Sequence, residues 1–271
     1  MVKTHLNKQL MVCVLLGCAA VGLGVQRAIT ADTQDLARAE EARFAAVEAC
    51  YPLPASKNVN AFRTAYKNVE SKQEWLTLVD SKNPLPAHYK PHDLTGTGRI
   101  LLREEAMIQM QKMQEAARKD GIILRPVSAY RSYDYQAGLF QRTKNPAYVA
   151  KPGHSQHQLG TAVDFNTVNP ADENIPALKW LRKHAGKYGF SLSFPKGEEK
   201  ETGYPYEAWH YRYITREGVI LQDAFFGGSQ HKMLDFLQKC LWPTGQTFVQ
   251  NQVRQSLRHL PAAQKAAIPA K

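Results

Sequence analysis

The feature that most constrains this chain is a polar, histidine-bearing loop that runs directly into an apolar segment. Residues 153–165 have the sequence GHSQHQLGTAVDF, in which Asp164 follows His157 by seven positions. Gly160 lies between them and can adopt the backbone conformations that a sharp turn requires. A loop that turns here into a strand can bring His157 and Asp164 together. Imidazole nitrogen and carboxylate oxygen are both good zinc ligands, so the stretch predicts part of a metal site.

A second segment places His210 three residues after Glu207. In a fully extended backbone these two side chains would point to opposite faces, so they need a bend to converge. His210 could be a third metal ligand, which would leave a fourth position for water, and Glu207 could take a proton from that water. Plainer interpretations remain open: a structural or surface histidine, an Asp164 that caps a turn, and a Glu207 that is a surface charge.

The remaining apolar patterns predict short strands mixed with helices. Helices are expected over residues 33–49, 61–69, 103–119, 133–142, 175–188, 216–226 and 232–239, and strands over 75–79, 122–128, 161–166, 190–194 and 210–214. There is no regular alternation of strand and helix, which favours an α+β fold with a small, mainly antiparallel sheet flanked by helices. The expected organisation is a leader (1–31), an N-terminal helical segment (32–72), a catalytic domain (73–230) and a C-terminal helix with a basic tail (231–271).

The N-terminus has the pattern of an export signal. Lys3 and Lys8 precede the uncharged residues 10–25, a stretch of 16. This is slightly long for a signal-peptide core and short for a membrane-spanning helix. A cleaved signal, an uncleaved anchor and a lipoprotein modified at Cys18 are the alternatives. All three place the rest of the chain outside the cytoplasm.

Export bears on the cysteines. Cys50 and Cys240 are the two that lie beyond the leader, and two cysteines in an oxidising compartment favour a disulfide. We therefore expect a bond between Cys50 and Cys240, with two buried free thiols as the alternative.

The net charge of +11 suits a polyanionic partner such as a wall polymer or a lipid surface. No helix-turn-helix, zinc-finger or aromatic RNA-binding signature accompanies this charge, so we expect no nucleic-acid partner.

Several motifs in a fixed order resemble those of the VanY-type D-alanyl-D-alanine carboxypeptidases, which belong to the LAS metallopeptidases (lysostaphin, D-Ala-D-Ala peptidases and the Hedgehog N-domain). The resemblance covers about residues 74–215. It includes NPLP at 83–86 with DL at 93–94, SAYRS at 128–132, SxHxxGxAxD at 155–164 and ExWH at 207–210. It implies a Hedgehog/D-Ala-D-Ala-peptidase-like fold with a zinc site in a cleft.

The resemblance also implies roles for individual residues. One Zn²⁺ would be bound by His157, Asp164 and His210, with Glu207 as the catalytic base. Arg131 would bind substrate and stabilise the developing oxyanion. Two weaker candidates for contacts to the terminal carboxylate of the substrate are Ser155 and Gln136.

The implied activity is removal of the terminal D-alanine from peptidoglycan stem peptides in a bacterial cell envelope. The enzyme would be periplasmic or anchored to the outer face of the inner membrane. An L,D-carboxypeptidase, a D-Ala-D-Ala dipeptidase and an endopeptidase on the same polymer share this chemistry and stay open. A non-catalytic wall-binding module is the alternative from another class.

Overall fold

The computed structural model describes residues 34–54, 56–165 and 175–242, so the leader and the basic tail lie outside the described residues. Within these ranges no helix combines the length and apolar character needed to cross a membrane. The chain divides into two compact units with a boundary between Pro52 and Leu53. In the first unit, residues 34–50 form the expected helix, with Phe44 and Val47 buried. Leu36 of the same helix is exposed.

A four-stranded sheet forms the centre of the second unit. The order is β3 (Pro126–Ser128), β4 (Ala162–Phe165), β6 (His210–Tyr213) and β5 (Phe190–Leu192), and each neighbouring pair is antiparallel. A separate antiparallel hairpin, which the sequence did not predict, joins β1 (Leu94–Thr97) to β2 (Ile100–Arg103). The predicted small antiparallel sheet of an α+β fold is thus confirmed.

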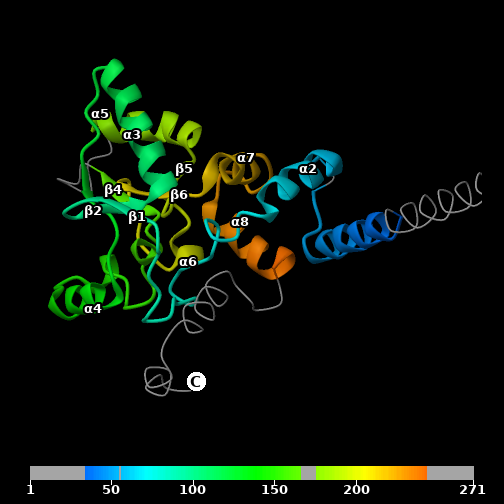
Figure 1. Ribbon diagram of the computed structural model, residues 1–271, viewed down its shortest axis with the longest axis horizontal. Helices are drawn as coiled ribbons and strands as arrows, with labels where there is room; N and C mark the ends of the chain where they lie inside the picture. The colour runs from blue at the N-terminus through cyan, green and yellow to red at the C-terminus, as the bar shows by residue number, and fades with distance from the viewer. Residues whose placement is uncertain (1–33, 55, 166–174, 243–271) are drawn as a thin grey trace, which may run out of the picture. The chain divides into compact units, whose positions relative to one another are not determined.

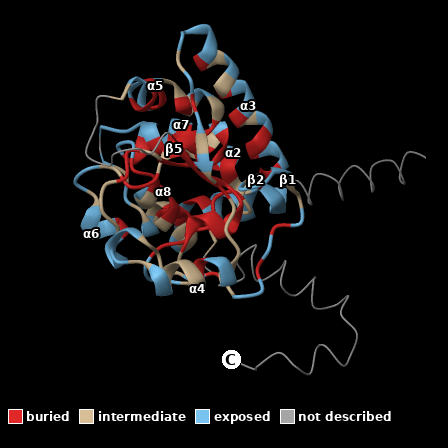
Figure 2. Ribbon diagram, turned by 90° about the vertical axis from the view of Figure 1, so that its left-hand side faces the viewer, coloured by how far each residue is buried: buried red, intermediate tan, exposed pale blue. Residues whose placement is uncertain are grey.

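Helices surround this sheet, with α3 and α5 at one end and α4 at the other in both views (Figures 1 and 2). Helix α3 buries a stripe of alanine and methionine side chains and turns its charged side to solvent. The ring of Phe62 in α2 packs against that of Phe225 in α7, with 5.0 Å between the ring centroids. The helices are α2 (Val59–Glu70), α3 (Glu104–Lys119), α4 (Tyr133–Arg142), α5 (Pro176–His184), α6 (Glu199–Thr202), α7 (Thr215–Phe225) and α8 (Gln230–Phe236).

The strand predicted over residues 75–79 is wrong, because this segment is a buried, irregular stretch. Two of its backbone carbonyls accept hydrogen bonds from a buried arginine side chain and not from a neighbouring strand. Nη2 of Arg212 donates to the carbonyl oxygens of Trp75 and Thr77, at 2.9 and 2.8 Å. The Trp75 ring lies 3.9 Å from the guanidinium carbon of Arg103. This apolar, partly β-branched segment therefore binds two arginine side chains, one through its carbonyls and one through the Trp75 ring.

The loop at residues 80–85 makes hydrogen bonds both to α8 and to the loop that carries His157. The Asp80 carboxylate accepts hydrogen bonds from His231 Nε2 (2.9 Å) and from the backbone and side chain of Asn83. The Asp80 carbonyl accepts one from His154 Nδ1 at 2.8 Å. Burial alone would raise the pKa of Asp80, but the hydrogen bonds from His231, Lys82 and Asn83 lower it to about 2. The folded state therefore favours the ionised carboxylate.

Substitution of Asp80 tests this connection. Because the pKa is below its ordinary 3.8, ionised Asp80 stabilises the fold above about pH 4, and this contribution is lost as the pH falls towards 2. We expect Asp80→Asn to lower the free energy of unfolding by about 1–2 kcal/mol at pH 7. The difference from the unsubstituted protein should shrink as the pH falls below 4 in urea titrations.

Asp235→Asn is the matched control, since its ion pair with Lys239 is at the surface and should contribute little. A stability difference for Asp80→Asn that stays constant from pH 7 to pH 3 would contradict the role given to the ionised group.

Candidate metal centre

His157 and Asp164 come together because the chain turns sharply between them. Residues Gln156–Leu159 form the short 3-10 helix η2, which ends at Gly160 with φ of 69°. The left-handed conformation at position 160 favours glycine, and a Cβ there would also lie 2.8 Å from Leu94 Cδ2, which would have to shift. The chain then enters β4, whose four residues are all buried. The interpretation of this stretch as a loop that turns into a strand is confirmed.

Strand pairing brings His210 to the same place. Asp164 of β4 and His210 of β6 are register partners, and side chains directly opposite one another in an antiparallel pair lie on the same face. A turn at residues 208–209 supplies the bend that Glu207 and His210 needed, with the His210 amide donating to the Glu207 carbonyl at 3.1 Å. Glu207 Oε2 consequently lies 3.7 Å from His210 Nδ1.

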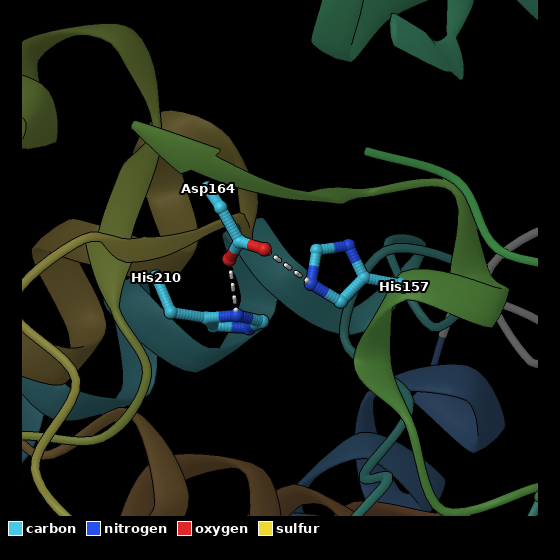
Figure 3. A group of neighbouring side chains, drawn as sticks. All are labelled: His157, Asp164 and His210. Atoms are coloured by element: carbon cyan, nitrogen blue, oxygen red, sulfur yellow. Dashed lines mark hydrogen bonds and ion pairs between the residues drawn. The ribbon is translucent and has the colours of Figure 1, made fainter. Parts of the chain in front are cut away.

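The Asp164 carboxylate lies between the two imidazole rings (Figure 3). Its Oδ1 is 2.9 Å from His210 Nδ1 and its Oδ2 is 3.3 Å from His157 Nε2. The candidate ligand atoms of the three residues all lie within 4.8 Å of one another, and all three residues are buried. Two donors on one tetrahedral zinc ion are about 3.3 Å apart, given bonds of about 2.0–2.1 Å. The cluster therefore fits a single zinc ion with little rearrangement.

Neighbouring acceptors determine which imidazole nitrogen is left for a metal. His157 Nδ1 donates to the Ala129 carbonyl at 2.6 Å, so Nε2 keeps its lone pair and faces Asp164. His210 has an acceptor at each ring nitrogen, with Asp164 Oδ1 2.9 Å from Nδ1 and Gln156 Oε1 3.2 Å from Nε2, so a proton held on Nε2 by Gln156 would leave Nδ1 free to bind a metal. Such acceptors orient metal-binding histidines and select the tautomer. The sequence did not reveal Gln156, although it stands between Ser155 and His157 in the quoted motif.

Arg131 lies immediately beside the cluster. Its Nη2 donates to Asp164 Oδ2 at 2.8 Å, and Nε and Nη2 donate to Ser128 Oγ at 3.1 and 2.9 Å. The same cation contributes to the electrostatics of His157, whose pKa is lowered to about 4, first by burial and then by the Arg131 charge. For Asp164, burial favours the neutral acid, but the two histidines outweigh it and hold the pKa well below the usual range. A neutral imidazole and an ionised carboxylate are the forms that bind metal.

Glu207 differs from Asp164 because, among the residues that the structure describes, none donates a hydrogen bond to its carboxylate to compensate for its burial. Burial raises its pKa to about 7, while the His210 ring opposes the shift and the Asp164 charge adds to it. A carboxylate with a pKa near neutrality can both accept and release a proton at physiological pH. Its position beside the three candidate ligands, but not among them, is the position of a general base in a hydrolytic metal site.

A cavity of about 100 Å³ opens over the cluster. Ser155 and Glu207 line it, and its wall includes the Tyr148 and Trp209 rings, whose centroids are 6.5 Å apart. Gln136 is buried and does not line the cavity; instead, its Nε2 donates at 2.7 Å to the carbonyl of Ala150, a lining residue. The structure thus brings six of the seven predicted site residues to one cavity and places Gln136 behind its wall.

Comparison with known proteins points to one family. Residues 99–216 match VanY, described as D-alanyl-D-alanine carboxypeptidase. The putative carboxypeptidase YodJ of Bacillus subtilis is 33% identical over 181 residues, and a D-alanyl-D-alanine carboxypeptidase of Enterococcus faecalis is 32% identical over 179. These alignments cover 58% and 59% of this chain and 66% of each relative, so the chain spans slightly less than two thirds of their length.

Solved structures agree. The LdcB LD-carboxypeptidase superposes with a TM-score of 0.54 at 32% identity, over 60% of this chain and 87% of LdcB. The vancomycin-resistance D,D-pentapeptidase VanY from a VanB-type cassette, solved as a variant with Zn(II), superposes with a TM-score of 0.51 at 27% identity, over 59% of this chain and 99% of VanY. These likenesses confirm the expected peptidase fold.

The Gln156 contact generates a prediction about metal affinity. Gln156→Leu removes the acceptor for His210 Nε2, so the tautomer that leaves Nδ1 free for a metal loses its stabilising hydrogen bond, and zinc affinity should fall about 10–100-fold. Gln156→Glu keeps an acceptor at the same distance and should retain affinity. Competition with a chromophoric chelator measures both.

Gln114→Leu is the control, because it removes a glutamine side chain whose hydrogen bond, to the Leu124 carbonyl, lies on α3, outside the cavity. Unchanged zinc affinity in Gln156→Leu would show that His210 is oriented without Gln156.

Proposed function

The chain belongs to the VanY D-alanyl-D-alanine carboxypeptidase family, and from this premise we propose that it is a zinc carboxypeptidase that removes the terminal D-alanine from peptidoglycan stem peptides. The observation that carries the proposal is the buried His157–Asp164–His210 cluster with Glu207 beside it. These four groups supply three ligands and one unligated carboxylate, which is the set that a hydrolytic zinc site requires.

The ligands in this proposal are His157 Nε2, one carboxylate oxygen of Asp164 and His210 Nδ1. Bound zinc would act as a Lewis acid on the scissile carbonyl and lower the pKa of a water molecule to about 7. The chain holds the ligands ready for this task, because Ala129 and Gln156 occupy the other nitrogen of each imidazole.

Glu207 and Arg131 carry the remaining chemistry. Glu207 takes a proton from the attacking water and then passes it to the departing amine of D-alanine, for which a pKa near 7 is suited. Arg131 stabilises the negative charge that develops on the carbonyl oxygen, since its guanidinium is held in place by Ser128 and Asp164. A fixed cation needs no reorganisation when that charge appears.

Ser155 is assigned to the terminal carboxylate of the substrate, and Gln136, the other candidate for that contact, is assigned to the wall behind it. Ser155 lines the cavity and can present its hydroxyl there, although in the present structure Oγ accepts from the His157 amide at 3.3 Å. Gln136 would act by holding the Ala150 backbone, and thereby the cavity wall, in place.

The similarity to LdcB favours a second activity at the same site, cleavage by an L,D-carboxypeptidase. A dipeptidase and an endopeptidase use the same chemistry and differ only in which part of the peptide the cavity accepts. A wall-binding module without turnover is disfavoured, since binding alone needs neither Glu207 as a base nor Arg131 beside the carbonyl.

The catalytic domain is assigned to residues 73–230, which contain every proposed site residue. The leader (1–31) would direct this domain to the periplasm or anchor it to the outer face of the inner membrane, where peptidoglycan is found. Residues 32–72 and 231–271 would be extensions to the domain. Peptidoglycan stem peptides are the proposed partner, and nucleic acid is not.

Glu207→Gln tests the proposed function. The amide cannot accept the proton, so we expect kcat to fall about 10²–10⁴-fold while zinc remains bound. The assay incubates zinc-loaded enzyme with defined pentapeptide and tetrapeptide muropeptides and identifies the products by mass spectrometry. Loss of one D-alanine from the pentapeptide supports the proposal, and loss from the tetrapeptide alone supports the L,D activity.

Glu199→Gln is the matched control, because Glu199 is an exposed residue of α6 and should leave turnover unchanged. Near-normal turnover by Glu207→Gln would overturn the assignment of the base. Absence of product from every muropeptide, with zinc bound, would overturn the proposed function.

The proposal includes a disulfide between Cys50 and Cys240. They are the cysteines that lie beyond the leader, and neither is a free thiol, as each is disulfide-bonded. Closing so long a loop stabilises the fold by about 4–5 kcal/mol in the chain-entropy model. The unreduced protein should therefore be two hydrogen atoms lighter than the reduced protein and should not react with a thiol reagent. Two reactive thiols in the folded, unreduced protein would contradict it.

A further inference from the structure

A second hollow lies on another side of Arg131. It has a volume of about 240 Å³, more than twice that of the cavity over the metal cluster. The turn of the β1–β2 hairpin forms one wall, and the segment from the end of β3 into α4 forms the other. Its side chains are Arg99, Ser128, Tyr130, Arg131, Ser132 and Tyr135. Because Arg131 lines both spaces, the hollow adjoins the catalytic cavity.

The hollow has the electrostatics of an anion site. Two of its lining residues are arginines and none is acidic. Arg99 is exposed and has no ion pair or hydrogen bond among the described residues. Arg131 uses Nε and Nη2 for Ser128 and Asp164, so Nη1 is the nitrogen without a partner in the described part of the chain. Unpaired guanidinium groups bind carboxylates strongly, since their planar donors match the two oxygens.

Helix α4 adds to this preference. Its N-terminal end, capped by Ser132, borders the hollow, and a helix of ten residues carries a partial positive charge there. Tyr130 and Tyr135 supply aromatic walls, and Tyr135 is 51% exposed, so its ring is accessible to a ligand. Cationic and aromatic groups around an open space suit an extended peptide that bears a carboxylate.

The size of the catalytic cavity indicates which part of the substrate reaches the hollow. The cavity over the metal cluster has a volume of about 100 Å³, which is small beside a pentapeptide, so the earlier residues of the peptide must extend along the neighbouring surface. Resting on the proposed function, in which Ser155 faces the terminal carboxylate, we propose that the hollow binds a carboxylate-bearing segment of the stem peptide on the N-terminal side of the scissile bond. Arg99 is then a specificity residue for acidic over amidated stem peptides, and it contacts the substrate at a distance from the reacting atoms.

The test compares two pentapeptides that differ in one group. N-acetyl-L-Ala-γ-D-Glu-L-Lys-D-Ala-D-Ala carries a free carboxylate, and its isoglutamine counterpart carries an amide. We expect the zinc-loaded enzyme to prefer the acidic peptide by about fivefold or more in kcat/KM, which is the effect of one exposed charged contact. The difference should lie in KM and not in kcat. Arg99→Gln should abolish the preference and Arg99→Lys should retain part of it. Diacetyl-L-Lys-D-Ala-D-Ala, which is too short for the hollow, should be cleaved equally by all variants.

Arg118→Gln is the matched control: it removes the same charge from an exposed position at the end of α3, outside the hollow, and should keep the preference. A preference that persists in Arg99→Gln, or that Arg118→Gln also removes, would overturn the inference.

Binding measurements separate this outcome from failure of the proposed function. Calorimetric titration of zinc-loaded Glu207→Gln with the two pentapeptides, with and without Arg99→Gln, needs no turnover. If the unsubstituted enzyme cleaves no peptide but binds the acidic one more tightly through Arg99, only the proposed function fails. If cleavage occurs and both pentapeptides bind equally, only the inference fails.

Discussion

The antiparallel pairing of β4 with β6 is the constraint on which the site depends. This register places Asp164 directly opposite His210, although the two residues are 46 positions apart in the sequence. A shift of one residue would turn His210 to the other face of the sheet, because successive side chains alternate. The turn at Gly160 then brings His157 to the same point. The metal centre is therefore built from strand register and one glycine, both of which are rigid features of the backbone.

Buried arginine side chains stabilise the strands in this register. Arg212 pairs with Ala162 across the two strands and is fully buried, with Nη2 bound to two carbonyls of the irregular segment that contains Trp75. Burial lowers its pKa to about 9, with Tyr89 acting in the opposite direction. Arg103, held by Glu74 and Asp93, stacks on the same tryptophan and borders Gly160. Both arginines thus connect the segment before the hairpin to the two strands of the site, and an apolar residue in place of Arg212 could not satisfy the buried carbonyls of Trp75 and Thr77.

Around the metal centre, the acids differ in environment and so in chemistry. Asp164 accepts from an arginine and faces two imidazoles, which keep it ionised, whereas Glu207 is buried without a close donor and has a pKa near neutrality. This division suits one carboxylate to binding metal and the other to moving protons. Arg131 has two roles beside these acids. It holds Asp164 on one side and faces an open, acid-free hollow on the other.

The sequence by itself determined the chemistry and most of the local structure. The order and spacing of His157, Asp164, Glu207 and His210 identified the cluster and the family, and helix periodicity placed α3, α4 and α7 to within a residue or two. Local patterns carry this information because turns, helices and motif spacing depend on nearby residues. Only the tertiary structure decided that residues 75–79 are a buried support and not a strand, that Gln156 orients His210, and that a hairpin completes a hollow beside Arg131. Each of these depends on which residues, distant in the sequence, bind a backbone carbonyl, an imidazole or a cation. A local sequence pattern contains no information about such partners.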